Sequence, residues 1–164
     1  YTTKILNAVE EVNFEQKHVI PRKVVERFGE DLTGKTFAIW GLAFKPDTDD
    51  MRQAAAITII NELTKRGAKV KAYDPKAEKE ARVCYLKDNK NVEYCDSKYT
   101  VLVDADAMIL VTEWKEFRQP DFIEIKKRLK NPVIFDGRNQ FDAHSLSDKG
   151  FEYYQIGVSS KLNK

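Results

Sequence analysis

Cysteine, methionine, histidine and glycine are scarce in this chain of 164 residues, which has two, two, two and seven of them. Cys84 and Cys95 are too few for a disulfide scaffold and lack the CxxC spacing of a zinc site, so we expect reduced thiols that behave as small buried hydrophobes. His18 and His144 have no nearby acid and nucleophile. We therefore expect neither a catalytic triad nor a metal site.

A strong charge of either sign and long apolar runs are absent too. The 28 basic and 26 acidic residues leave a net charge of +2, which is too small a field to attract nucleic acid or a membrane surface. No apolar run approaches the roughly 20 residues of a membrane helix, and no basic-then-apolar leader opens the chain. We expect a cytoplasmic protein. Because the chain opens at Tyr1 within a helical pattern and its first methionine is Met51, we also expect it to be part of a longer protein.

The first thirty residues show the periodicity of a long helix. Apolar residues recur at helical spacing through residues 5–12 and again through 24–28. Pro21 is expected to kink or restart this helix, and Gly29 to end it. Residues 1–30 are therefore interpreted as a helical segment that precedes the main domain.

Residues 31–164 alternate between short β-rich runs and helical patterns. Helices are expected around 56–63, 77–86, 99–103 and 122–129, and strands at 36–40, 69–73, 91–94, 107–111, 133–135 and 151–154. This alternation predicts an α/β fold, a Rossmann-like, doubly wound and mainly parallel sheet of about six strands preceded by a long helix.

Ligands of open α/β sheets bind outside the carboxyl ends of the strands, which selects the loops that follow Trp40, Val111 and Phe135. The first loop, residues 41–52 (GLAFKPDTDDMR), has one glycine where a dinucleotide fingerprint has three. Its bulky residues 44–46 stand where the backbone should approach a pyrophosphate. A normal NAD site in this loop is therefore disfavoured.

The same loop offers two cations and several helix caps. Lys45 lies on a turn stiffened by proline. We expect the next helix to be capped by Thr48, Asp49 or Asp50, which places Arg52 in its first turn. A cation there opposes the helix macrodipole, so Arg52 has no evident stabilising reason for its position. A solvated arginine is the simpler alternative.

Three further residues at strand ends have two interpretations each. Asp74 could bind ribose hydroxyls, but it lies 33 residues after Gly41 rather than the usual roughly 20, and a turn-starting Asp-Pro is favoured. Arg138 could bind a phosphate or carboxylate, or pair structurally with Asp136. Glu113 could line the site, although a capping role is favoured.

Four segments together resemble the UDP-glucose 6-dehydrogenase family, within the UDP-glucose/GDP-mannose dehydrogenases. They are residues 41–52, 72–75 (AYDP), 112–114 (TEW) and 135–139 (FDGRN), in the family's order. The resemblance implies a carboxyl-terminal UDP-sugar-binding Rossmann-like domain over 31–164. Residues 1–30, with Asn13, then match the end of the central helix that connects the two halves and builds the dimer.

The resemblance also implies an activity, the oxidation of UDP-glucose to UDP-glucuronate with two NAD molecules and a catalytic cysteine. Phe44, Lys45 and Arg138 would bind substrate, and Arg52 would contact the NAD held mainly by an amino-terminal domain. Implied partners are UDP-glucose, that amino-terminal domain and a second copy in a homodimer.

The chain departs from the family in lacking the GxGxxG domain and the context of the catalytic cysteine, which neither Cys84 nor Cys95 resembles. No catalytic residue is therefore assigned, and the isolated chain is expected to be inactive. The alternatives are a stand-alone nucleotide-binding or regulatory module, and the same domain of a UDP-N-acetyl-sugar or GDP-mannose dehydrogenase.

Overall fold

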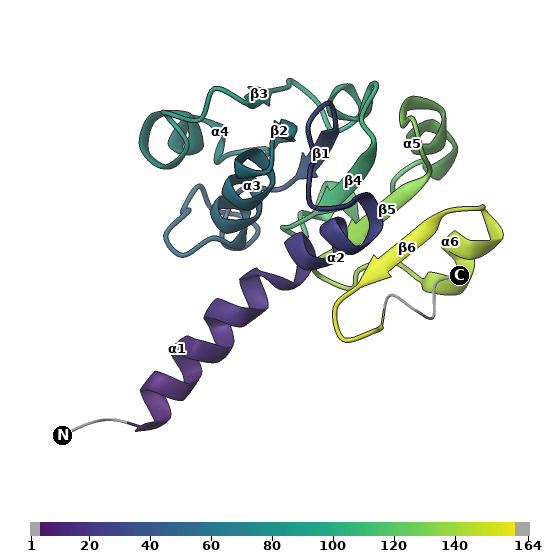
Figure 1. Ribbon diagram of the computed structural model, residues 1–164. Coiled ribbons are helices and arrows are strands. Elements are labelled where there is room, and N and C mark those ends of the chain that lie inside the picture. Colours follow the sequence, from purple (N-terminus) through teal and green to yellow (C-terminus); the bar gives the residue numbers. More distant parts are fainter. Residues whose placement is uncertain (1–3, 160–164) are drawn as a thin grey trace.

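The computed structural model describes residues 4–159, which form one six-stranded sheet with helices on both faces (Figure 1). All neighbouring strands are parallel, in the order β3-β2-β1-β4-β5-β6. The strands are β1 (Thr36–Trp40), β2 (Lys69–Tyr73), β3 (Val92–Tyr94), β4 (Ala107–Leu110), β5 (Val133–Asp136) and β6 (Glu152–Gln155). The predicted fold class is confirmed. Strand order reverses between β1 and β4, so a ligand crevice is expected outside their carboxyl ends.

The helices connect these strands as the sequence pattern predicts, with two additions. They are α1 (Lys4–Lys17), α2 (Val19–Phe28), α3 (Ala55–Lys65), α4 (Glu78–Glu80), the π-helix η1 (Ala81–Tyr85), the 3₁₀ helices η2 (Thr100–Leu102) and η3 (Lys115–Phe117), α5 (Phe122–Arg128) and α6 (Ala143–Asp148). Helices η3 and α6 were not predicted. None of the helices within residues 4–159 is long and apolar enough to cross a bilayer.

Strand β1 shows why both faces of the sheet are covered. Phe37 meets the ring of Phe28 of α2 edge-on at 5.4 Å, whereas Trp40 stacks on Phe117 of η3 at 4.9 Å. These two strand positions point to opposite faces, and both side chains are fully buried. A strand buried on both sides reads as a continuous apolar run, which is the pattern of a central parallel strand.

The amino-terminal helical segment breaks at His18 and not at Pro21. His18 lies between α1 and α2, while Pro21 is buried in the first turn of α2. A proline is tolerated there because the first-turn N–H groups have no intrahelical partner. Gly29, with φ of 93°, follows the end of α2 at Phe28, as predicted.

Helix α2 belongs to the body of the domain, whereas α1 projects away from it (Figure 1). Ile20 and Val24 of α2 are buried in the core. Arg27 binds the carboxylate of Glu152 on β6 through hydrogen bonds of 2.6 and 2.8 Å. On α1, by contrast, Val9 is 50% and Val12 is 66% exposed. The predicted apolar face of the first helix therefore faces solvent along much of its length.

Candidate functional site

A cleft of about 1000 Å³ lies between α1 and the carboxyl ends of the central strands. One wall comes from α1, and the other from the loops that follow β1, β4 and β5, with further residues from α2, α3 and the segment after β6. The lining residues are Asn7, Glu10, Glu11, Asn13, Phe14, Gln16, Lys17, Ile20, Ala43, Phe44, Gln53, Ala55, Ile59, Val111, Gly137, Arg138 and Ile156. The crevice predicted from strand topology is thus present, and α1 gives it depth.

The loop after β1 and the loop after β4 approach closely at Gly41. Its φ is +93°, and a Cβ built there would lie 2.5 Å from the Cβ of Thr112. The Thr112 hydroxyl donates a hydrogen bond of 2.6 Å to the carbonyl oxygen of Ala43. Glycine at position 41 is required both for the backbone conformation and for this contact.

Asp74, at the end of β2, turns into the protein rather than toward the cleft. Its Oδ1 accepts hydrogen bonds from the backbone N–H groups of Lys76 and Ala77 at 2.9 and 2.8 Å. Its Oδ2 accepts from the N–H groups of Leu42 and Ala43 at 2.6 and 3.0 Å. Asp74 is only 4% exposed. The turn interpretation of Asp74 is confirmed, and its carboxylate is not placed for ribose.

This arrangement does not fit a dinucleotide in the loop after β1. A Rossmann loop directs its backbone N–H groups at a pyrophosphate, but here those of Leu42 and Ala43 are taken by Asp74. A larger residue at Gly41 has no room, and the bulky Phe44 stands three residues further along the loop. NAD therefore has no conventional phosphate cradle in this loop.

Phe44 and Lys45 stand at the exposed tip of that loop. The Phe44 ring is 54% exposed, although it is a large hydrophobe, and it lines the cleft. The N–H of Phe44 donates to the carbonyl oxygen of Asp50 at 2.9 Å, which closes the loop. Lys45 is exposed beside it but is not among the residues that line the cleft.

Arg52 lies before α3, not in its first turn as predicted, because α3 begins at Ala55. The helix cap is Ala54, without a side-chain hydrogen bond, so the expectation of a cap at residues 48–50 is wrong. The Arg52 guanidinium binds the Asp50 carboxylate at 2.8 Å. Hydrogen bonds from Arg52 lower the pKa of Asp50 to about 2. This pair is solvent-exposed, so it orients Arg52 without contributing much stability.

Arg138 lines the cleft from the loop after β5, and its guanidinium pairs with both carboxylate oxygens of Glu113. Asp136 accepts a hydrogen bond from the backbone N–H of Arg138 at 2.8 Å but does not pair with its side chain. Burial is the largest single influence on the pKa of Glu113 and acts to raise it, but the hydrogen bonds to Glu113 and the charge of Arg138 together lower the pKa. The favoured capping role of Glu113 is wrong, since it orients an arginine.

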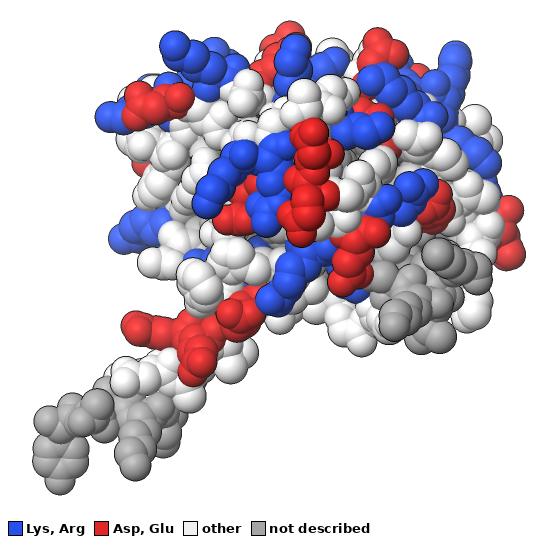
Figure 2. Space-filling view, in the orientation of Figure 1, with Lys and Arg blue, Asp and Glu red and all other residues white. Residues whose placement is uncertain are grey.

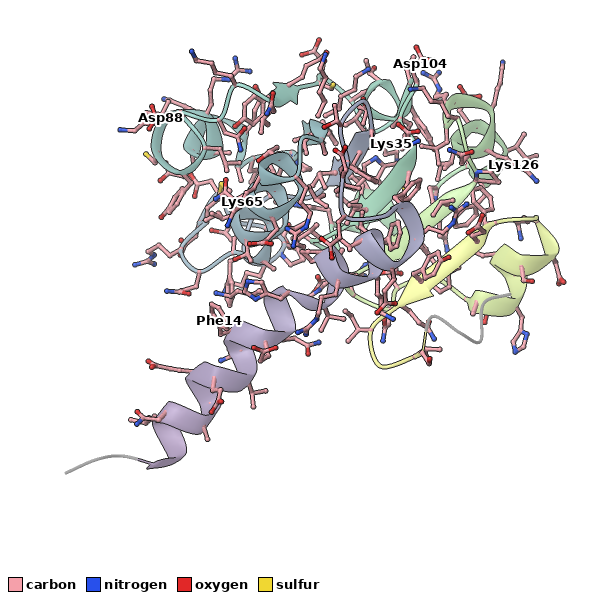
Figure 3. The ribbon with its side chains drawn as sticks, viewed as in Figure 1. Phe14, Lys35, Lys65, Asp88, Asp104 and Lys126 are labelled. Carbon is pink, nitrogen blue, oxygen red and sulfur yellow. The ribbon has the colours of Figure 1, made fainter. Side chains whose placement is uncertain are left out.

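The wall formed by α1 was not identified from sequence, where Asn13 was only a match to the family's central helix. Phe14 marks the place where α1 meets the rest of the domain (Figure 3). Lys17 donates a hydrogen bond of 2.8 Å to the side-chain oxygen of Gln53, which links α1 to the segment before α3. Polar residues on a helix give no periodic signal of a ligand, because a solvated face has the same composition.

The cysteine and histidine side chains of the described residues form no second catalytic or metal site. Cys95 is buried as expected, but Cys84 is exposed. Burial raises the pKa of Cys95, which keeps it a neutral thiol. His144 lies on α6. Within residues 4–159, no group of three metal-ligating side chains is found.

Charges of both signs are mixed over most of the face shown in Figure 2. Acidic side chains gather along the projecting helix, where Glu10, Glu11 and Glu15 lie. Glu10 and Glu11 line the cleft together with Lys17 and Arg138. The cleft therefore offers both signs, which suits a polar ligand with phosphate and hydroxyl groups.

The parallel sheet, its strand order and the crevice at the switch point define a Rossmann-like nucleotide-binding domain. Residues 38–143 match the UDP binding domain of the UDP-glucose/GDP-mannose dehydrogenase family. The chain belongs to this family, and the predicted resemblance is confirmed.

Individual relatives agree with this assignment. The chain is 40% identical over 159 residues to a UDP-glucose 6-dehydrogenase of Pseudomonas aeruginosa, which covers 96% of this chain and 35% of the relative. It is 40% identical to the UDP-glucose 6-dehydrogenase TuaD of Bacillus subtilis, over 96% of this chain and 33% of the relative. The chain thus spans about a third of the length of these proteins.

Solved structures show the same fold. A UDP-glucose dehydrogenase from Pyrobaculum islandicum superposes with a TM-score of 0.73 at 29% identity, over 91% of this chain and 31% of that one. An NDP-N-acetyl-D-galactosaminuronic acid dehydrogenase from Methanosarcina mazei superposes with a TM-score of 0.72 at 27% identity, over 93% of this chain and 31% of that one.

Proposed function

We propose that this chain is the substrate-binding part of an NAD-dependent UDP-glucose 6-dehydrogenase, which oxidises UDP-glucose to UDP-glucuronate with two NAD molecules. The observation that carries the proposal is the match to the family's UDP binding domain over residues 38–143. It is supported by the cleft at the strand ends, where Phe44 and Arg138 both line the wall.

The residues of the cleft suit a nucleotide sugar. The exposed ring of Phe44 offers an apolar face for a flat base or a sugar ring. Arg138, held by Glu113, presents a planar guanidinium that suits phosphate oxygens. Lys45 supplies a flexible cation beside them. We assign all three to the UDP-sugar.

The NAD cofactor is assigned mainly to an amino-terminal domain outside this chain, with Arg52 reaching toward it. Two observations support this division: the loop after β1 does not fit a dinucleotide, and Arg52 is exposed on the surface. Because the chain has no assigned nucleophile, we expect no NADH when it is mixed with UDP-glucose and NAD. Appreciable NADH formation would contradict this.

Replacing Lys45 with alanine is expected to weaken the binding of UDP-glucose about tenfold, since a charge-assisted contact to phosphate is lost. Calorimetric titration of this chain with UDP-glucose, UDP and NAD measures the change. The matched control is Lys65→Ala, which removes an exposed lysine of α3 outside the cleft. An unchanged affinity would remove Lys45 from the site. Tighter binding of a UDP-N-acetyl sugar or of GDP-mannose would favour a related dehydrogenase.

We further propose that α1 carries the homodimer contact of the parent enzyme. Val9 and Val12, 50% and 66% exposed, form part of an apolar face that no described residue covers. Val12→Glu is expected to reduce self-association in sedimentation experiments, while Glu15→Gln on the same helix leaves it unchanged. Equal behaviour of both variants would contradict this assignment.

The stand-alone module is the competing class, and the coding sequence upstream of Tyr1 distinguishes the two. A strand followed by GxGxxG and a later cysteine in a glycine-rich segment supports the enzyme, whereas an unrelated domain supports the module. Cytoplasmic location stays a prediction from the sequence.

A further inference from the structure

We infer that Asp74 is a positioning residue, whose buried carboxylate holds the loop that presents Phe44 and Lys45 to the substrate. This inference rests on the proposed function for the substrate, but its structural part is tested separately. Asp74 does not line the cleft, so it acts through the loop rather than by touching a ligand.

The Asp74 carboxylate joins the loops that follow three strands. From the loop after β1 it accepts the N–H groups of Leu42 and Ala43. From its own loop after β2 it accepts two more backbone N–H groups, those of Lys76 and Ala77. From the loop after β4 it accepts the indole N–H of Trp114, whose Nε1 lies 3.0 Å from Oδ2. One side chain therefore ties together the ends of β1, β2 and β4.

The loop after β1 is held from both sides at Ala43, where it reaches the cleft. The N–H of Ala43 donates to Asp74, and its carbonyl oxygen accepts the Thr112 hydroxyl. Phe44 is the next residue and is 54% exposed. Because Ala43 is buried and fixed through both its backbone polar groups, the direction in which the chain emerges toward Phe44 and Lys45 is determined there.

Asp74 accepts N–H groups that a dinucleotide-binding loop would offer to a phosphate. A carboxylate has two oxygens with about four acceptor sites, which can satisfy five donors only when some are shared. Asparagine has nearly the same shape but replaces one oxygen with an NH₂ group, which would place a donor against donors. Asp74→Asn thus removes acceptor capacity while preserving size.

The matched control is Asp106→Asn. Asp106 is also 4% exposed, and its carboxylate accepts the N–H of Thr36 at 2.9 Å. It precedes β4 and therefore lies at the end of the sheet opposite to the cleft. Both substitutions remove a buried charged acceptor, so both are expected to lower stability. Only Asp74→Asn is expected to affect the substrate loop.

The experiment compares the wild-type chain with both variants by amide NMR and by titration with UDP-glucose. In Asp74→Asn, we expect the amide resonances of Leu42 and Ala43 and the indole N–H of Trp114 to shift and to lose protection from hydrogen exchange. We expect the dissociation constant for UDP-glucose to rise about tenfold. In Asp106→Asn these resonances and the affinity are expected to stay as in the wild type.

Unchanged loop resonances or unchanged affinity in Asp74→Asn would overturn the inference. The loop resonances could change as expected while the wild-type chain does not bind UDP-glucose. That result would contradict the proposed substrate and the role of Asp74 toward it. The conclusion that Asp74 holds the loop after β1 would still stand. Should Asp74→Asn fail to fold, Trp114→Phe removes the indole donor, together with part of a buried ring, and leaves the Asp74 carboxylate in place. It is then expected to shift the Leu42 and Ala43 resonances, and no shift would overturn the inference.

Discussion

Replacing Gly41 with alanine is expected to lower the free energy of unfolding by about 3 kcal/mol or more. Two effects add at this position. The φ of +93° is unfavourable for any residue with a Cβ, and that Cβ would lie 2.5 Å from the Cβ and 2.6 Å from the backbone nitrogen of Thr112. The neighbouring atoms belong to backbone and to a β-branched side chain, so they have little freedom to move. Denaturant unfolding of the purified chain measures the loss.

Gly29→Ala is the control for the Gly41 substitution. Gly29 has the same φ of +93°, but no atom lies within 4 Å of the position its Cβ would take. With ψ of 171°, Gly29 adopts a conformation nearly restricted to glycine, so we expect the variant to lose only the backbone contribution, about 1–3 kcal/mol. The difference between the two variants then measures the close approach of the loops after β1 and β4. Equal losses would contradict the importance of that contact.

Replacing Asp136 with asparagine is expected to destabilise the domain by about 3 kcal/mol or more, because buried donors lose their charged acceptor. Asp136 ends β5 and is fully buried. Its oxygens accept the backbone N–H groups of Arg138, Gln140 and Phe141 and the hydroxyl of Tyr153, at 2.8 to 3.1 Å. The loop that carries Arg138 is therefore organised by this carboxylate.

Tyr153→Phe separates the contributions at Asp136. It removes one donor and leaves the three backbone donors in place, so we expect a smaller loss of about 1 kcal/mol. Burial and the nearby Asp136 raise the pKa of Tyr153, which keeps its hydroxyl protonated and able to donate. A loss in Tyr153→Phe as large as in Asp136→Asn would show that the backbone donors contribute little.

Much of the fold could be predicted from local patterns. Alternating apolar runs and helical periodicity identified all six strands, because a central parallel strand needs apolar residues on both faces. Gly29 was recognised as a helix end from local sequence too, because glycine readily adopts a positive φ. Helices η3 and α6, of three and six residues, were missed.

The candidate site could be located but not resolved from the sequence. Strand topology selected the loops that contain Phe44 and Arg138, and both line the cleft. The predicted position of Arg52 was wrong because a helix cap was expected at residues 48–50. The chain instead forms a turn there, in which the N–H of Arg52 donates to the Asp50 carboxylate. The contribution of α1 to the cleft was missed, because a helix that lines a cleft with polar residues has the same composition as a solvated one.

By itself the sequence determined the α/β class, the family and the loops that hold the site, because these follow from periodicity and from motifs contiguous along the chain. Only the tertiary structure decided what the acidic residues at the strand ends do. Asp74 holds the loop after β1 and Glu113 orients Arg138, both across distant segments. Asp136 organises the loop that follows it through nearby N–H groups, and its distant partner is the Tyr153 hydroxyl. Such choices depend on which strand ends meet in space, and residues 32 or 25 positions apart carry no local sign of it.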